Sequence, residues 1–368
     1  MHLPHLLPTL ALTAHLTTAA YILQDDYTPD TFFDKFNFFT AQDPTNGHVD
    51  YIDRAAAESA GLISTGSSIH MGVDTTNLAP NGRQSVRLES TATYNKGLFI
   101  IDLAHMPQGC GVWPAFWLLG PSWPSGGEID IIENVNSATT NHMTLHTSDG
   151  CSLDASAGYT GTTLTTNCFV NAPGQANNAG CGIQAPKGSS SYGGPFNSIS
   201  GGVYATEWTS DVMNVWFFPR SDVPADIGSE SPNPSSWGSP LARFTSTNCD
   251  IDAHFTDMQI IFDITFCGDW AGNVWGSDGT CSSLGTCVDW VSGNPGEFEE
   301  AFWDINSLRV FKRAVDMESG NVFAADAVLD LNSLDMEDKA SSTPEFGENV
   351  KMSEKTKCMT AKGYRNQV

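Results

Sequence analysis

The sequence predicts an all-β protein, and three of its features support this class. Hydrophobic and polar residues alternate over several short stretches, which is the period of a half-buried strand. The 34 glycines and 19 prolines suit many short strands joined by turns. Patterns with helical periodicity are scarce. With 368 residues, of which 40% are hydrophobic, the chain is long enough for one large β domain.

The expected strands follow one another along the chain. An N-terminal segment with several phenylalanines supplies core aromatics, and residues 43–47 form a turn. Residues 203–208 and 212–218 predict a hairpin, while residues 148–200, rich in Gly, Ser and Asn, predict a long loop region held by cysteines. The other expected strands are residues 85–90, 98–103, 128–133, 143–147, 258–266 and 302–311.

One of these strands carries an unusual set of acids. Residues 126–134 read GGEIDIIEN, so three carboxylates are interleaved with isoleucine, a strand-forming residue. Glu128 and Asp130 point to the same face of a strand, but strict alternation sends Glu133 to the other face. We therefore expect a β-bulge at Ile131 and Ile132 that returns Glu133 to the shared face. Three acids facing a cleft are what glycoside hydrolysis requires.

Two plainer explanations of this strand remain open, a solvated sheet edge and a calcium site built from oxygen ligands. The residues upstream favour a cleft that binds sugar. Trp113, Trp117 and Trp123 all lie within fifteen residues of the first acid. Aromatic faces stack on the C–H faces of sugar rings, and carboxylates bind the hydroxyl groups. Three tryptophans leading into three carboxylates thus indicate a carbohydrate site.

The chain resembles fungal laminarinases of glycoside hydrolase family 16 over roughly residues 21–313. The resemblance is specific because separated motifs occur in the family's order. These motifs are HMPQGCG at 105–111, WPA at 113–115, WP at 123–124, GEIDIIE at 127–133, MTLHT at 143–147, VWFFPR at 215–220 and FCGDWAG at 266–272.

The resemblance implies a concanavalin-like β-jelly-roll sandwich with a substrate cleft across its concave sheet. It also implies an endo-1,3(4)-beta-glucanase that hydrolyses β-1,3- and mixed β-1,3/1,4-glucans with retention and without a cofactor. The fold is compatible with a structural calcium away from the cleft, but no ligand set in the sequence assigns a metal. Glu128 would attack the anomeric carbon and Glu133 would protonate the leaving oxygen. Asp130 would lie between them and hydrogen-bond one of them, and His146 would be a hydrogen-bond partner of the acids.

The resemblance further implies sugar platforms at Trp117, Trp123 and Trp270, with Trp113 equally compatible with core or cleft. Two polar residues are candidate sugar contacts. Arg87 either binds glucose hydroxyls or holds a carboxylate of its own sheet, and Asn46 lies in the turn at 43–47. One departure from close laminarinases is the apolar, shorter loop at residues 118–122, which puts tolerance of glucan branches in question.

Charge and cysteine content bear on partners and location. The chain has 17 basic and 42 acidic residues, a formal charge of −25, which argues against nucleic acid or an anionic membrane as partner. Residues 1–20 contain an apolar run and predict a signal peptide, although no Lys or Arg precedes the run. The nine cysteines then suggest disulfides in a secreted protein, and we expect a monomer without a membrane span.

The composition changes near residue 314. Residues 21–313 form the expected catalytic domain, and residues 314–368 are acidic, lack tryptophan and predict a flexible extension that contains Cys358. Two further function classes stay open. A cell-wall glucan transglycosylase would carry the same acidic strand, and a non-catalytic glucan-binding protein would keep the sandwich but usually lack one glutamate.

Overall fold

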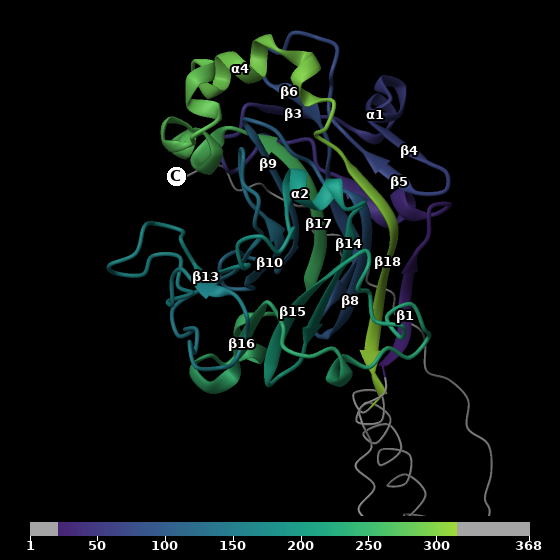
Figure 1. Cartoon of the computed structure of the whole chain (residues 1–368), viewed down its shortest axis with the longest axis vertical. Helices are drawn as coiled ribbons and strands as arrows, with labels where there is room; N and C mark the ends of the chain where they lie inside the picture. The colour runs from purple at the N-terminus through teal and green to yellow at the C-terminus, as the bar shows by residue number, and fades with distance from the viewer. Residues whose placement is uncertain (1–20, 315–368) are drawn as a thin grey trace, which may run out of the picture. The chain divides into compact units, whose positions relative to one another are not determined.

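A computed structural model of the protein describes residues 21–314. The predicted signal peptide, the extension beyond residue 314 and Cys358 lie outside the described residues. Within residues 21–314 the chain forms a jelly-roll sandwich of two eight-stranded sheets and a small two-stranded one (Figure 1). The all-β prediction is confirmed.

The first sheet runs in the order β16-β15-β14-β8-β18-β5-β4, and β1 pairs with the far end of β18. Its neighbouring strands are antiparallel, and Figure 1 shows β14, β15, β8 and β18 beside one another. The strands are β1 (Tyr21–Tyr27), β4 (Ile63–Thr65), β5 (Ile69–Met71), β8 (Gly97–His105), β14 (Gly202–Trp208), β15 (Val212–Pro219), β16 (Ala242–Thr245) and β18 (Trp303–Arg313).

The second sheet carries the acidic strand and has the order β12-β13-β11-β10-β9-β17-β7-β2. Its strands are β2 (Phe36–Phe38), β7 (Arg87–Tyr94), β9 (Val112–Leu119), β10 (Glu128–Glu133), β11 (His142–His146), β12 (Thr162–Thr163), β13 (Cys181–Gln184) and β17 (Met258–Phe266). The parallel pair β3 (Val49–Tyr51) and β6 (Arg83–Ser85) completes the strands of the described residues.

The main core lies between the two large sheets. Alternate residues of each strand enter it, for example Phe116 and Leu118 of β9 and Phe262 and Ile264 of β17, all fully buried. The residues between them on these strands face away from the core, and this alternation leaves one face of the second sheet for a binding site.

The first sheet is buried on both faces, which explains the continuous apolar run in β8. Phe99 and Ile101 enter the main core, whereas Leu98 and Ile100 belong to a second apolar cluster on the other face. This cluster includes Trp237, which comes from the loop between β15 and β16.

The helices are short and lie in the connections. Helix α1 begins after Asp53, whose side chain accepts a hydrogen bond from the Ala56 amide, and it ends at Gly61, whose φ is 71°. None of the helices in the described part is long and apolar enough to cross a bilayer. The helical segments are α1 (Arg54–Ala60), α2 (Gly193–Ser198), α3 (Ile251–His254), α4 (Cys287–Gly293), η1 (Phe32–Lys35), η2 (Pro234–Ser236), η3 (Ser246–Asn248), η4 (Gly268–Gly272), η5 (Trp275–Ser277), η6 (Cys281–Leu284) and η7 (Pro295–Phe298).

All eight cysteines among residues 21–314 form disulfides. The pairs are Cys110–Cys281, Cys151–Cys249, Cys168–Cys181 and Cys267–Cys287. The third pair closes a short loop within the region 148–200, as the sequence predicted for that region. Disulfides of this number are typical of proteins that fold in an oxidising compartment.

Candidate active site

The β-bulge predicted in the acidic strand is present. Along β9, Trp117 pairs with Asp130 and Phe116 pairs with Ile132, so Ile131 is the extra residue. The shift brings Glu133 to the same face as Glu128 and Asp130, and all three acids line one cleft. The isoleucines between them are buried against the core.

A side chain that lies just before the next strand, β11, satisfies the backbone of the bulge. Asn141 is fully buried, its amide donates to the carbonyl of Ile131 at 2.7 Å, and its oxygen accepts from the amide of Glu133 at 2.9 Å. A bulge leaves backbone groups without a ladder partner, and an unpaired buried group is costly. Asn141 therefore fixes the backbone that carries Glu133. The sequence reasoning missed this residue.

The cleft has a volume of about 890 Å³ and crosses the second sheet from β7 to β13. Its floor consists of the residues of each strand that point away from the core. It brings together nine of the ten predicted site residues, Arg87, Trp113, Trp117, Trp123, Glu128, Asp130, Glu133, His146 and Trp270.

Glu128 lies at one end of the acidic triplet, beside an exposed tryptophan. The indole N–H of Trp123, a side chain from the preceding loop that is 44% exposed, donates to Glu128 Oε2 at 2.5 Å. Burial and the nearby charge of Asp130 raise the pKa of Glu128 to about 7, although His146 and the indole act in the opposite direction.

Glu133 lies at the other end and has its own indole donor. Trp113 Nε1 donates to Glu133 Oε1 at 2.8 Å, so Trp113 lines the cleft and is not a core residue. Burial, followed by the charge of Asp130, raises the pKa of Glu133 well above its usual range.

The middle acid differs from its expected role. Among the described residues no hydrogen bond joins Asp130 to either glutamate; its charged neighbour is His146, with Nε2 3.3 Å from Asp130 Oδ2. In the strand pairing His146 lies opposite Glu128 and Thr144 lies opposite Asp130, so His146 reaches Asp130 diagonally. Burial alone would lower the pKa of His146, but Glu128, Asp130 and Glu133 together raise it to about 9. His146 is therefore a cation within the acidic group.

The sequence left two roles open for Arg87, binding of glucose hydroxyls and a bond to a carboxylate of its own sheet. The structure shows the second of these contacts. Its Nε and Nη2 donate to Glu89 Oε1 at 3.1 and 2.9 Å. Its guanidinium also lies over the rings of Phe39 and Trp117, 4.6 and 5.2 Å from their centroids. Arg87 thus supports one face of a cleft tryptophan.

The remaining predicted contact, Asn46, is not among the residues that line the cleft. Its φ is 59°, as the predicted turn requires, and its amide donates to Asp269 Oδ2 at 2.9 Å. Asn46 thereby connects the turn to the segment that carries Trp270. A direct contact with sugar stays a prediction.

The cleft residues that were not predicted from the sequence include Asp263 and His142. Asp263 on β17 accepts from Trp117 Nε1 at 3.0 Å and from the Tyr51 hydroxyl at 3.2 Å. Burial, opposed by Arg87, raises the pKa of Asp263 to about 7. A lone acid within the apolar run of residues 258–266 was a signal for Asp263, because buried acids need a specific reason.

A further partly buried acid, Glu207 on β14, has a structural role. It lies on the first sheet, where its carboxylate accepts from the Tyr21 hydroxyl at 2.8 Å and from the Asn214 amide at 2.9 Å. It is not among the residues of the cleft.

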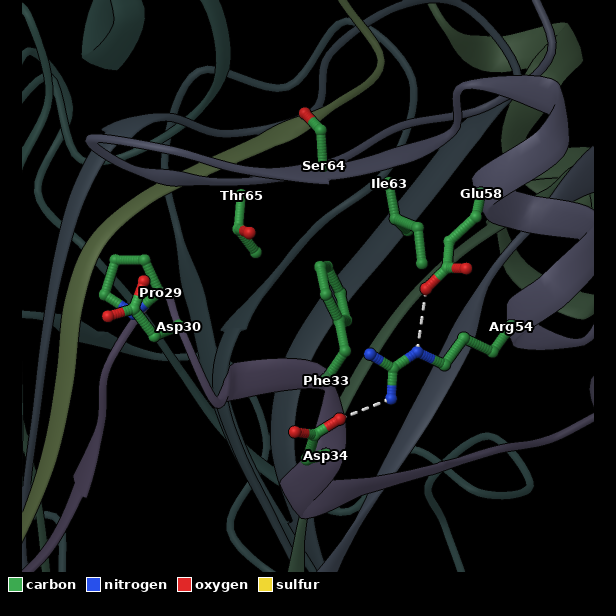
Figure 2. Close-up of a pocket in the computed structure, with 9 residues that line it drawn as sticks. All are labelled: Pro29, Asp30, Phe33, Asp34, Arg54, Glu58, Ile63, Ser64 and Thr65. Atoms are coloured by element: carbon green, nitrogen blue, oxygen red, sulfur yellow. Dashed lines mark hydrogen bonds and ion pairs between the residues drawn. The ribbon is translucent and has the colours of Figure 1, made fainter.

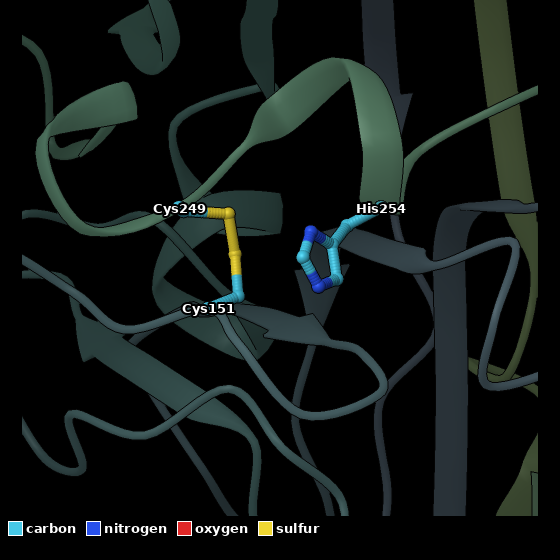
Figure 3. A group of neighbouring side chains, drawn as sticks. All are labelled: Cys151, Cys249 and His254. Atoms are coloured by element: carbon cyan, nitrogen blue, oxygen red, sulfur yellow. A yellow bond between two sulfur atoms is a disulfide. The ribbon is translucent and has the colours of Figure 1, made fainter.

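Two clusters in the described part have the composition of metal sites, and chemistry argues against both. Glu128, Asp130 and His146 offer ligand atoms within 4.8 Å of one another, but His146 Nε2 already faces Asp130 Oδ2 at 3.3 Å as its ion-pair partner. Cys151, Cys249 and His254 also lie together (Figure 3), but both sulfurs form a disulfide and the imidazole faces the carbonyls of Asp250 and Asp149.

A second hollow, of about 230 Å³, shares no lining residue with the cleft. Its central cation, Arg54, is already paired with Asp34 at 2.6 Å and with Glu58 at 2.9 Å (Figure 2). The cleft is the better candidate site because its acids have raised pKa values and are flanked by aromatic rings.

The chain is similar to known proteins over the region that builds this cleft. Residues 36–311 match the family model described as XgeA-like, catalytic GH16 domain. An endo-1,3(4)-beta-glucanase of Arthroderma benhamiae is 48% identical over 308 residues, which are 83% of this chain and 67% of that protein.

Two solved structures share the fold at substantial identity. Laminarinase 16A of Phanerochaete chrysosporium, with beta-glucans in its donor and acceptor sites, is 44% identical with a TM-score of 0.75, covering 80% of this chain and 100% of that one. An elongating family 16 beta-1,3-glucosyltransferase is 46% identical with a TM-score of 0.74, covering 79% and 100%.

Proposed function

This chain belongs to glycoside hydrolase family 16, and from this we propose that it is an endo-1,3(4)-beta-glucanase that cleaves internal bonds of β-1,3- and mixed β-1,3/1,4-glucans with retention. The observation that carries the proposal is the bulged strand β10, whose three acids share the floor of an aromatic-lined cleft. The names of the relatives support the same substrate class.

The reaction proceeds in two steps at Glu128 and Glu133. We assign the ionised form to Glu128, because the cation at His146 pairs with it across the strands, and the protonated form to Glu133, whose pKa burial raises. The Glu128 carboxylate attacks the anomeric carbon as Glu133 protonates the departing oxygen. The Glu133 carboxylate then removes a proton from water, which attacks the glycosyl-enzyme and releases the sugar with its configuration retained.

Asp130 and His146 act on the two glutamates and do not react themselves. The charge of Asp130 raises the pKa of both, and the cation at His146 lowers it. Their ion pair holds Asp130 in a fixed position between the two reacting carboxyls. A fixed charge between them helps keep one glutamate ionised while the other remains protonated.

The substrate is a neutral polysaccharide that stacks on Trp117, Trp123 and Trp270. Trp117 is held by Asp263 at its N–H and by Arg87 at its face. A ring fixed in this way loses little conformational entropy when a sugar stacks on it. We expect the enzyme to act as a secreted monomer, and the four disulfides of residues 21–314 support the location.

One other function has a specific observation in its favour, transfer of the glycosyl group to a second sugar. The elongating beta-1,3-glucosyltransferase is about as similar to this chain as the laminarinase is. Both functions share the first step and differ in whether water or a sugar hydroxyl attacks the glycosyl-enzyme. A non-catalytic glucan-binding protein ranks last, because both glutamates are present in one cleft.

The test is release of reducing ends from laminarin and mixed-linkage glucan by wild type, Glu128→Gln and Glu133→Gln. We expect wild type to be active and both variants to lose about 10²–10⁴-fold or more. Product analysis with added oligosaccharide separates the functions, since longer products identify transfer. Unchanged release by both variants would exclude this site.

Azide distinguishes the two roles. With an activated aryl glycoside, Glu133→Ala should yield the β-glycosyl azide, because azide replaces water in the second step. Glu128→Ala should yield the α-glycosyl azide, because azide replaces the attacking carboxylate. The reverse pattern would exchange the roles of the two residues.

A further inference from the structure

His142 has no role in the two proposed reaction steps, although it lies beside the proposed acid, Glu133. His142 is the first residue of β11 and pairs directly with Glu133 across the bulge. Its side chain lines the cleft. Position alone makes it a neighbour of the departing sugar.

The imidazole of His142 is held at its face by another aromatic residue. Its ring stacks on Trp270 with centroids 5.6 Å apart and an interplanar angle of 29°. Trp270 in turn meets Trp113 edge to face at 5.7 Å, and Trp113 donates its N–H to Glu133. These contacts hold the imidazole of His142 in a fixed position beside the carboxyl group of Glu133.

The two ring nitrogens of His142 have no hydrogen-bond partner within residues 21–314. The imidazoles of His48, His105 and His254, by contrast, all contact oxygen atoms of the protein. The side chain is half-buried, and neither nitrogen is among the buried polar atoms of the described residues that lack a partner, so both stay accessible to water or to a ligand. Such a group at the wall of a binding cleft is suited to a ligand that supplies the missing partner.

The protonation state of His142 gives its ring the donor and acceptor needed for hydrogen bonds to a sugar hydroxyl. Burial lowers the pKa of His142 to about 4, so the ring is neutral at the pH where Glu128 is ionised. A neutral imidazole has one N–H donor and one acceptor nitrogen. A hydroxyl group likewise both donates and accepts. A charged group would instead favour an anion.

We propose that His142 hydrogen-bonds a hydroxyl of the glucose unit that leaves with the oxygen protonated by Glu133, and so determines specificity on the leaving-group side. The inference rests on the proposed function, in which Glu133 is the acid. The sugar that receives this proton lies within hydrogen-bonding reach of Glu133, where His142 and Trp270 form the adjoining wall.

The test compares substrates with and without a leaving sugar. Laminarin-derived tetrasaccharide has a glucose leaving group, whereas 4-nitrophenyl β-laminaribioside releases only a phenol. For His142→Phe, which keeps a ring against Trp270, we expect kcat/KM to fall about tenfold on the tetrasaccharide, the loss of one hydrogen bond. On the aryl glycoside it should change less than about twofold.

Two further variants complete the design. His142→Gln keeps a donor and an acceptor and should retain more tetrasaccharide activity than His142→Phe, whereas a role in stacking alone predicts the opposite order. His70→Phe makes the same exchange on β5 of the other sheet and should leave both rates unchanged.

Different outcomes would contradict the proposed role of His142 and the proposed glucanase function. Equal losses on both substrates, or no loss on the tetrasaccharide, would overturn the inference while the glucanase stands. If wild type cleaves neither substrate, the proposed function falls and the inference falls with it.

Discussion

A single positive charge lies among three carboxylates at the centre of the cleft. Neighbouring charges and single hydrogen bonds determine which carboxylate keeps a proton. His146 favours the charged form of both glutamates, whereas Asp130 opposes it. Each glutamate also has its own indole donor, Trp123 for Glu128 and Trp113 for Glu133. A hydrogen bond to a carboxylate stabilises its charged form, so each tryptophan lowers the pKa of one glutamate only.

Replacing Trp123 by Phe should therefore move one limb of the pH profile. The nucleophile must be ionised, so activity is lost as pH falls through the pKa of Glu128. Trp123→Phe removes the donor, raises this pKa above about 7 and shifts the acid limb of kcat/KM to higher pH by about half to one unit. Rates on an aryl glycoside across the pH range would measure the shift.

Trp117→Phe is the matched control for this prediction. Its indole donates to Asp263 and to no glutamate, so the acid limb should stay in place even if substrate binding weakens. Trp113→Phe should instead move the alkaline limb to higher pH, because it raises the pKa of Glu133. An acid limb that does not move in Trp123→Phe would contradict the assignment of Glu128.

At the scale of the element, β10 shows what sequence spacing can and cannot reveal. The spacing of its acids predicted the bulge, because the side-chain period of a strand is fixed at two. It did not predict Asn141, which satisfies the bulge from outside the strand. Nor did it predict that Asp263 holds Trp117, since these residues are 146 positions apart and meet only because β17 pairs with β9.

Two single-residue deletions test the bulge. Deleting Ile131 removes the extra residue, so Glu128, Asp130 and Glu133 keep a strict period of two and all still face the cleft. Deleting Ile129 instead turns Glu128 toward the core. Each deletion removes one fully buried isoleucine, at a cost of about 2–5 kcal/mol in unfolding free energy.

The two deletions should differ in activity more than in stability. We expect measurable hydrolysis after deletion of Ile131 and a loss of about 10⁴-fold or more after deletion of Ile129, which misplaces the nucleophile. Reducing-end assays with circular dichroism as a folding control would compare them. Equal activities would show that the period of the strand does not determine which acids reach the substrate.

At the scale of the whole described domain, the sheets form the cleft floor and the loops form its walls. Alternation predicted eight of the eighteen strands of the described residues and missed the central strand β9. The order of strands in each sheet depends on contacts distant in sequence, and cysteine spacing did not reveal the pairing. The disulfides secure loops: Cys168–Cys181 closes the loop that brings Asn178 to the cleft, and Cys267–Cys287 joins the end of β17 to α4.

The four disulfides should therefore differ in what their loss costs. In the chain-entropy account, a bridge stabilises the fold by restricting the unfolded chain, more so for a longer closed loop. Cys110–Cys281 spans 171 residues and Cys168–Cys181 only 13, so removing them by paired alanine substitution should cost about 5 and about 3 kcal/mol, respectively. Urea unfolding monitored by tryptophan fluorescence would measure both, provided that the slopes with denaturant agree.

Loss of the two disulfides should affect activity in the opposite order from stability. The short loop contributes the cleft wall around Asn178, so Cys168→Ala with Cys181→Ala should raise KM for glucan more than the other pair does. The long bridge joins Cys110, ahead of β9, to Cys281 in η6, and neither cysteine lines the cleft. Its loss should therefore lower the unfolding free energy with little change in KM. If the short bridge proved the more stabilising of the two, the chain-entropy account would fail for this domain. The effect would then have to come from native contacts such as those of Gln175, which bonds to backbone groups of Thr166, Asn167 and Gly180 at the two ends of the loop.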